Sequence, residues 1–246
     1  MGAGGNRSRR DVLAAITSAF SLAITHAAGA EGKSTMKHVA LLGDSVFDNS
    51  AYIAGGPDVV THLRQRLPPG WRGSLLANDG GVMNDVPGQL ARLPSDASHL
   101  VISIGGNDAL RQAWLLNEAS HSVSDSLTRL AAVRERFKAE YAGMLETVAR
   151  RGLPTAVCTI YDPRYPNPAE RLVALMALMV INDCIIREAG SRGLPIIDLR
   201  VVCDDDADFA NPIEPSVKGG FKIAGAIVAL LGTHDFSRSR SEIFSR

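Results

Sequence analysis

Short apolar runs alternate with stretches of helical periodicity along most of the chain. Five of these runs are predominantly apolar and do not alternate with polar residues, which is typical of strands buried on both faces of a parallel sheet. They span residues 38–42, 74–77, 100–104, 155–160 and 195–202. The stretches between and after them predict helices over residues 58–67, 86–93, 126–151, 169–189 and 216–231. The alternation predicts an α/β domain with a five-stranded parallel sheet.

Strands and helices in strict succession indicate a three-layer sandwich with right-handed crossovers and helices on both faces of the sheet. We expect one domain over residues 36–232, because the sequence contains no internal repeat and no second unit. The Arg- and Ser-rich residues 233–246 are expected to form a polar tail.

The first 30 residues have the pattern of an export leader. Three arginines within residues 7–10 precede a short apolar stretch over residues 12–25, and Ala-Gly-Ala at 28–30 offers a cleavage site. The arginine pair is similar to a twin-arginine signal, so export to the periplasm is favoured. The alternative is translation from Met36, which would leave the protein in the cytoplasm.

Composition narrows the classes of partner. Lys and Arg together number 26, as do Asp and Glu, so no overall field attracts nucleic acid or an anionic membrane. The apolar part of the leader is shorter than the roughly 20 residues of a membrane span. The three cysteines lack metal-ligand spacing and are expected to fill the core, with Cys158 and Cys203 in strands. We expect a small-molecule substrate and no cofactor.

Three polar segments follow the first, third and fifth predicted strands, at residues 43–49, 105–108 and 204–216. The carboxyl ends of parallel strands lie at one edge of the sheet, where α/β proteins bind ligands. The three segments are therefore predicted to meet in one cleft.

Two of these segments carry side chains suited to acyl transfer. Ser45 follows a buried strand directly, and the preceding Gly43 permits a sharp turn that exposes the hydroxyl as a nucleophile requires. Asn107 follows two glycines, and its amide can donate to a developing oxyanion. Taken singly, each segment could be a capping turn, but their joint occurrence favours chemistry.

Residues 43–48 and 105–108 resemble block I (GDSxxD) and block III (GxND) of the SGNH/GDSL hydrolases. The resemblance covers most of the chain and implies a flavodoxin-like fold and hydrolysis of carboxylic esters or thioesters. It also implies that Ser45 is the nucleophile, with its own backbone N–H and the Asn107 side chain as oxyanion donors.

The remaining two blocks of the family fit less well. Block II would supply an oxyanion N–H from residues 78–83, where the position falls on Gly81 or a neighbouring residue, depending on the alignment. The last block, DxxH, aligns with residues 211–214, so that Asn211 stands at the aspartate position and Glu214 at the histidine position.

Glu214 in place of histidine leaves two hypotheses open. A glutamate with an ordinary pKa near 4.3 is a weak base, but burial near Asp44 or Asp48 would raise its pKa and improve it. Asn211 could then orient Glu214 by hydrogen bonding without like-charge repulsion. We favour a serine hydrolase with Glu214 as base; the alternative is a degenerate protein that binds an acyl or sugar ligand.

Two further alternatives concern other residues at the same edge. His121 is the one histidine in a loop that begins at this edge, which makes it a possible replacement base, although loop histidines are more often solvated. The carboxylates of Asp44, Asp48, Asp108 and Glu214 could bind a hard cation. We instead expect these aspartates to support the surrounding turns, and no metal site.

Overall fold

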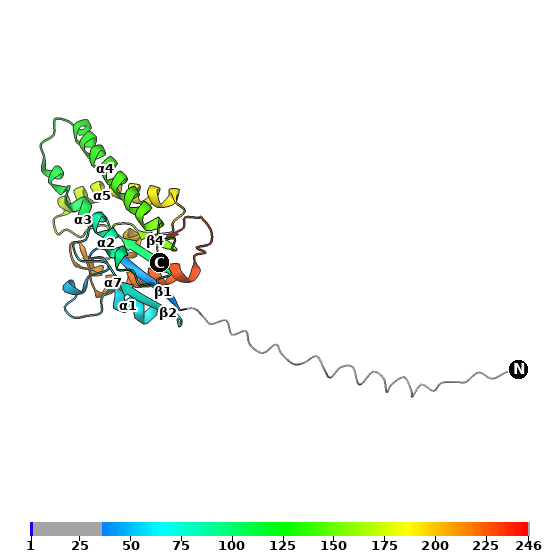
Figure 1. Cartoon of the computed structure of the whole chain (residues 1–246). Helices are drawn as coiled ribbons and strands as arrows, with labels where there is room; N and C mark the ends of the chain where they lie inside the picture. The colour runs from blue at the N-terminus through cyan, green and yellow to red at the C-terminus, as the bar shows by residue number, and fades with distance from the viewer. Residues whose placement is uncertain (2–35, 246) are drawn as a thin grey trace. The chain divides into compact units, whose positions relative to one another are not determined.

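The computed structural model describes Met1 and residues 36–245. The predicted leader, apart from Met1, lies outside the described residues. The chain divides into two units at Thr35, and the unit that begins at Met36 holds every helix and strand given below (Figure 1).

The centre of this unit is a six-stranded sheet in the order β2-β1-β3-β4-β5-β8, in which all paired neighbours are parallel. In this order the strands are Trp71–Leu75, Lys37–Gly43, His99–Ser103, Thr155–Cys158, Ile196–Ile197 and Ile243–Phe244. The predicted parallel sheet is confirmed, but it has one strand more than expected. The additional strand, β8, comes from the stretch predicted to be a polar tail.

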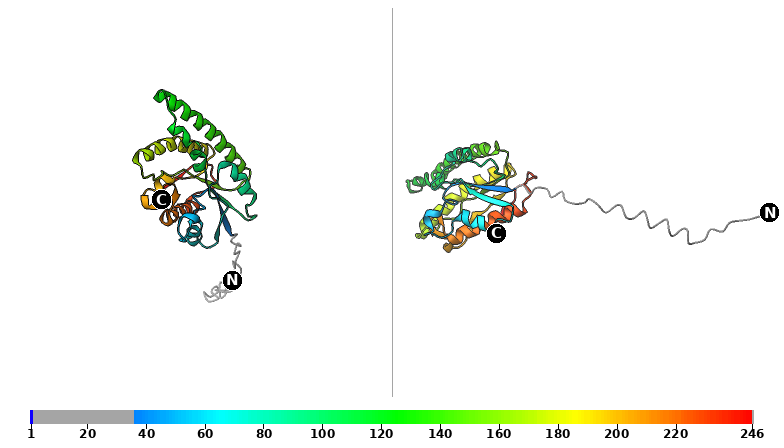
Figure 2. Two further views of the ribbon diagram at one scale, coloured as in Figure 1. Left: turned by 90° about the vertical axis from the view of Figure 1, so that its left-hand side faces the viewer. Right: turned by 60° about the horizontal axis from the view of Figure 1, so that its bottom comes forward.

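Helices cover both faces of the sheet (Figures 1 and 2). On one face, α1 (Val59–Arg66) and α7 (Val217–Thr233) pack against alternate residues of β1 such as Leu41. On the other, α2 (Val86–Ala91), α4 (Val123–Ala149) and α5 (Pro168–Ser191) pack against the intervening residues such as Leu42. Every residue of β1 after Lys37 is buried, which explains its continuous apolar sequence.

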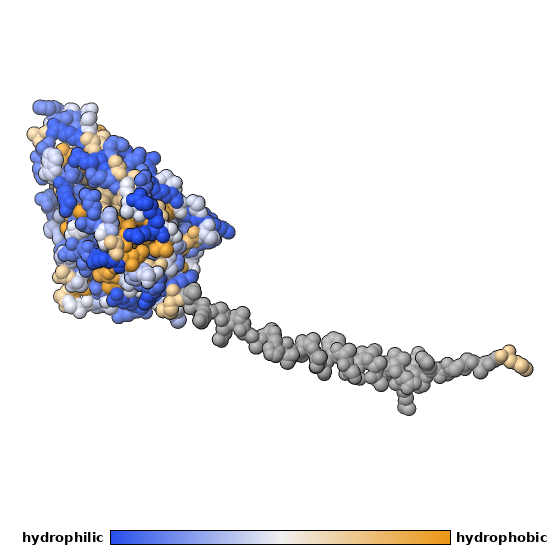
Figure 3. Space-filling model, viewed as in Figure 1, coloured by the Kyte–Doolittle hydropathy of each residue, from blue (hydrophilic) through white to orange (hydrophobic). Residues whose placement is uncertain are grey.

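The outer side of α4 faces solvent. Its exposed residues include Glu135 and Arg136, whereas Phe137, Tyr141 and Leu145 are buried beside the sheet. Figure 3 accordingly shows a mostly hydrophilic surface over α4. The helix is therefore amphipathic, as its sequence predicts.

The fifth predicted strand is shorter than expected. β5 ends at Ile197 because the side chain of Asp198 accepts a hydrogen bond from the Arg200 N–H and caps a short helix, α6 (Leu199–Val202). Cys203 consequently follows a helix and does not lie in a strand, contrary to the sequence prediction, although it is buried and free like the other cysteines.

The segment after α6 contains regular secondary structure. It contains the 3-10 turn η4 (Asp206–Asp208) and a two-stranded antiparallel ribbon formed by β6 (Phe209–Asn211) and β7 (Glu214–Pro215). Three further 3-10 turns, η1 (Ser50–Tyr52), η2 (Met83–Asp85) and η3 (Ala113–Asn117), and the one-turn helix α3 (Gly106–Leu110) surround the carboxyl edge of the sheet. No helix in the described part of the chain has the length and apolar character needed to cross a bilayer.

Candidate active site

Ser45 lies in the turn immediately after β1. Gly43, the last residue of the strand, has φ of +130°, and a Cβ at this position would overlap the carbonyl oxygen of Ser103. Only glycine tolerates this backbone conformation and this close approach without strain. The buried Gln89 side chain holds the turn from below, since its amide oxygen accepts from Gly43 N and its amide nitrogen donates to Gly43 O, each at 2.7 Å. The turn that carries Ser45 is thus held by β3 and by α2.

Glu214 begins β7 and faces Ser45 across the edge of the sheet. The Ser45 hydroxyl donates a hydrogen bond to Glu214 Oε1, with an oxygen–oxygen distance of 3.1 Å. Both residues are buried, and the second carboxylate oxygen, Oε2, has no hydrogen-bond partner among the described residues. A serine hydroxyl and a carboxylate therefore form a direct pair, although they are 169 residues apart in the sequence.

Asn211 positions the backbone of Glu214 and not its carboxylate. Its side-chain oxygen accepts from the N–H groups of Ile213 and Glu214 at 3.0 and 2.9 Å. The sequence predicted a polar pair between the side chains of Asn211 and Glu214, whereas in the structure the Asn211 side chain bonds to the Glu214 backbone. The reason is geometric, because the tight ribbon between β6 and β7 turns the Asn211 side chain back onto the chain itself.

Three residues that the sequence analysis did not identify hold the same ribbon. The Tyr161 hydroxyl donates to Ile213 O at 2.5 Å, the Arg164 backbone N–H donates to Pro212 O at 2.7 Å, and the Asn49 amide donates to Pro215 O at 3.0 Å. Their carbonyl partners flank Glu214 on both sides. Every residue has a backbone carbonyl group, so the sequence does not distinguish the ones that accept these hydrogen bonds, and the contacts could not be predicted from it.

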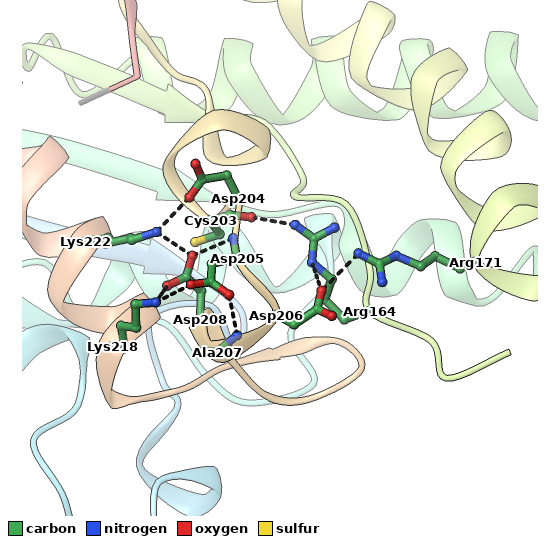
Figure 4. A network of polar contacts seen from close by, with 10 residues as sticks. All are labelled: Arg164, Arg171, Cys203, Asp204, Asp205, Asp206, Ala207, Asp208, Lys218 and Lys222. Atoms are coloured by element: carbon green, nitrogen blue, oxygen red, sulfur yellow. Dashed lines mark hydrogen bonds and ion pairs between the residues drawn. The ribbon is translucent and has the colours of Figure 1, made fainter. Parts of the chain in front are cut away.

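A network of ion pairs anchors the other side of this segment (Figure 4). Asp208, which is fully buried, accepts from Lys222 on α7 at 2.6 Å, and Lys218 lies 3.7 Å from its other carboxylate oxygen. Arg164 and Arg171 both contact Asp206, at 3.2 and 3.1 Å. The acidic segment from Asp204 to Asp208 therefore connects the ribbon to α7 and to the segment before α5.

Burial gives the site two carboxyl groups with high proton affinity. The pKa of Glu214 is raised to about 7, first because the group is buried and then because the Asp79 carboxylate lies nearby, although the hydrogen bond from Ser45 opposes the rise. Burial also raises the pKa of Asp44 to about 8, and the charges of Glu214 and Asp108 contribute to this rise. A base with a pKa near 7 is well matched to proton transfer at neutral pH.

Asn107 lies in the first turn of α3, and together with Ser45 and Glu214 it lines one cavity. One N–H of its amide donates to Gly81 O at 2.9 Å, and an amide nitrogen carries a second hydrogen that can point elsewhere. The Gly81 N–H donates to Asn78 O at 3.0 Å, so within this structure it already has an acceptor. The geometry therefore supports Asn107 more directly than Gly81 as an oxyanion donor.

The three aspartates of the two motifs hold turns. Asp44 accepts from Val46 N at 3.1 Å, Asp48 accepts from Asp79 N at 2.9 Å, and Asp108 accepts from Met83 N at 3.2 Å. Within residues 36–245 no group of three or more His, Cys, Asp or Glu side chains is arranged to hold a metal ion. Their contacts are those of supports for the turns around Ser45.

Asp79 and Tyr52 form a polar pair near Glu214 that the sequence analysis missed. The Tyr52 hydroxyl contacts both carboxylate oxygens of Asp79 at 2.9 Å. The pKa of Tyr52 is raised to about 12 by burial, by this hydrogen bond and by the charge of Glu214. Asp79 follows the second strand, as Gly81 does, so proximity to block II was the available signal for it, whereas Tyr52 lies in η1 after the first strand.

His121 is exposed in the loop before α4, where its backbone N–H donates to Asp125 at 3.2 Å. The described residues that line the cavity at Ser45 do not include it. The structure thus brings Ser45, Asn107 and Glu214 together and leaves His121 outside the group.

The cavity at Ser45 has a volume of about 500 Å³. Its floor contains Ser45, Asn107 and Glu214, and its walls come from α3, η3, α4 and α5 together with the segment from Ile160 to Tyr165. A volume of this size lies within the roughly 300–1,000 Å³ of pockets that hold small organic ligands.

Comparisons with solved structures identify the type of fold. No protein-family model matches the sequence, and no curated protein matches it. Among solved structures, an extracellular lipase from Streptomyces rimosus is 17% identical over 81% of this chain and 100% of its own, with a TM-score of 0.56. A lipolytic protein of the G-D-S-L family from Veillonella parvula is 12% identical over 80% and 100% of the two chains, with a TM-score of 0.59.

An acetylxylan esterase, Axe2 from Geobacillus stearothermophilus, is 18% identical over 82% of this chain and 97% of its own, with a TM-score of 0.55. All three structures align with most of the described unit. The chain therefore has the fold of the GDSL-type lipases and esterases, as the resemblance of its motifs predicts.

Proposed function

We propose that the protein is a serine hydrolase that cleaves a carboxylic ester or thioester through an acyl-enzyme. The observation that carries the proposal is the 3.1 Å hydrogen bond from Ser45 Oγ to Glu214 Oε1. It joins a nucleophile to a base in the geometry that activation of a hydroxyl requires. The similar solved structures, which are lipases and esterases, favour the same class of reaction.

In this mechanism Ser45 Oγ attacks the carbonyl carbon and Glu214 accepts the hydroxyl proton. The second N–H of the Asn107 amide and the Ser45 backbone N–H donate to the oxyanion of the tetrahedral intermediate. Glu214 then returns the proton to the leaving alcohol. Water then attacks the acyl carbon while Glu214 takes a proton from it. The bond from the acyl carbon to Ser45 Oγ breaks, Oγ receives that proton from Glu214, and the carboxylic acid leaves.

A second candidate is a binding protein that has lost turnover. One observation favours it, because the Gly81 N–H already donates to Asn78 and would have to exchange that partner to stabilise an oxyanion. Against it stands the pKa of Glu214, which at about 7 suits a working base. The two candidates differ in whether Ser45 reacts.

Labelling with a fluorophosphonate probe tests the proposal. We expect modification of Ser45, mapped by mass spectrometry, and no labelling of the Ser45→Ala variant. Glu214→Gln should lower kcat for p-nitrophenyl acetate by about 10²–10⁴-fold, which is the usual contribution of a general base.

Glu118→Gln is the matched control, because Glu118 is exposed and pairs with Arg129 outside the cavity. It should retain the full rate. Unchanged turnover in Glu214→Gln would refute the role of Glu214 and make His121→Ala the next variant to measure. A protein that is inert to the probe but binds an acyl or sugar ligand would favour the second candidate.

A further inference from the structure

The cavity extends well beyond the atoms that react. Past Ser45 and Asn107 it is lined by α4 and α5, and apart from Glu170 in the first turn of α5 the lining residues of these two helices are aliphatic. The side chains that define this part are Leu130, Val133, Ala174, Ala177, Leu178 and Ile181. Such walls provide no hydrogen-bond partner for a hydroxyl group, so a sugar or hydroxy acid would lose its hydration there without compensation.

We propose that this part of the cavity is a binding site for an unbranched acyl chain, so that the substrate is an ester or thioester of a medium-length fatty acid. The proposal rests on the hydrolase function given above and specifies its acyl group. The whole cavity, of about 500 Å³, lies within the size range of pockets that enclose small organic ligands, which suits an acyl chain of medium length.

Two alanines on α5 create the space between the helices. Ala174 and Ala177 lie three residues apart and therefore on the same face of the helix, where both line the cavity. Residues with long side chains at these positions would occupy the space that the chain needs. Met179 lies on the same helix but is 54% exposed and does not line the cavity.

The other side of Ser45 offers a different environment. Asp79 is exposed there, Asp48 and Tyr52 are half-buried, and all three present polar groups near Glu214. An apolar chain gains nothing from this surface, whereas an alcohol or another polar leaving group can remain hydrated on it. We therefore place the acyl group in the space between α4 and α5 and the leaving group on the side of Tyr52.

The dependence of kcat/KM on chain length tests the site. Across p-nitrophenyl esters from acetate to octanoate, kcat/KM should rise by up to about fourfold for each methylene that is fully buried, and should level off when the cavity is full. Ala177→Trp should lower the ratio of the octanoate value to the acetate value by about 100-fold or more. Ala174→Phe serves the same purpose if circular dichroism shows that Ala177→Trp does not fold. Met179→Trp, which adds a similar bulk outside the cavity, should leave the ratio unchanged.

Calorimetric titration of Ser45→Ala with decanoate separates this inference from the function on which it rests. We expect decanoate to bind, and we expect the added Ala177→Trp change to abolish binding. Acetate hydrolysis without a rise toward octanoate, together with no decanoate binding, would overturn the acyl-chain site and leave the hydrolase intact. Decanoate binding without hydrolysis of any ester would support the site and refute the hydrolase.

Discussion

At the scale of single residues, the site depends on a carboxyl group, that of Glu214, whose pKa is raised well above its ordinary value. Glu214 is only 6% exposed, and its pKa of about 7 results mainly from that burial. A carboxylate of ordinary pKa would be a poor acceptor for the proton of a serine hydroxyl. The surroundings of Glu214, and not its chemical identity, make it comparable to a histidine in proton affinity.

The raised pKa of Glu214 predicts how activity depends on pH. Glu214 accepts a proton only when ionised, so kcat/KM should rise about tenfold per pH unit below its pKa of about 7 and become constant above it. Asp79→Asn removes a neighbouring negative charge, which should move the midpoint to lower pH. The measurement is a kcat/KM profile between pH 4 and 9. A midpoint near that of a solvated glutamate, unaffected by Asp79→Asn, would contradict the role assigned to the buried carboxylate.

At the scale of elements, Glu214 lies in a two-stranded ribbon whose strands, Phe209–Asn211 and Glu214–Pro215, contain only five residues in total. So short a ribbon has little stability of its own. Its position depends on hydrogen bonds to Tyr161 and Asn49, and on the buried pair of Asp208 with Lys222 that connects it to α7 (Figure 4). Gly219 permits the close approach of α7 to the backbone of Asp208, because a Cβ at this position would overlap the carbonyl oxygen of Asp208.

Removing one partner of the buried pair should destabilise the protein. Lys222→Met leaves the Asp208 carboxylate buried without its nearer cation, and the free energy of unfolding should fall by about 3 kcal/mol. Urea denaturation followed by circular dichroism measures the change. Lys218→Met is the matched control, because Lys218 is 3.7 Å from the same carboxylate and is exposed, so its loss should have little effect. Equal stabilities of the two variants would show that the pair does not anchor the ribbon.

At the scale of the whole molecule, the repeating pattern of apolar runs was sufficient to predict the parallel sheet and the edge where Ser45, Asn107 and Glu214 meet. It could not predict contacts whose partners are backbone atoms far along the chain. Gln89 bonds to Gly43 across 46 residues, Tyr161 to Ile213 across 52, and Asn49 to Pro215 across 166. These contacts exist only once the chain has folded, and they complete the site that the motifs begin.

The strand β8 escaped prediction for a related reason. Its two residues, Ile243 and Phe244, stand alone in a polar stretch, and two apolar residues are too few to show a period. Their role depends on β5, since the N–H groups of Ile196 and Asp198 donate to the carbonyl groups of Glu242 and Phe244 at 2.8 and 2.7 Å. The edge of the sheet is thus closed by a segment that has no strand signal by itself.

Deleting residues 242–246 should therefore lower stability without altering the chemistry. The N–H groups of Ile196 and Asp198 lose their acceptors, at about 1 kcal/mol each, and the packing of Phe244 against the core is lost as well. A total near 3 kcal/mol corresponds to a fall in Tm of roughly 6–12 °C, which calorimetry can measure. The kcat/KM at 25 °C should stay within about twofold, because β8 lies four places from β1 in the sheet and far from Ser45. Phe244→Ala keeps the backbone pairs and should cause the smaller fall; an equal fall in the two variants would mean that packing and not strand pairing holds this edge.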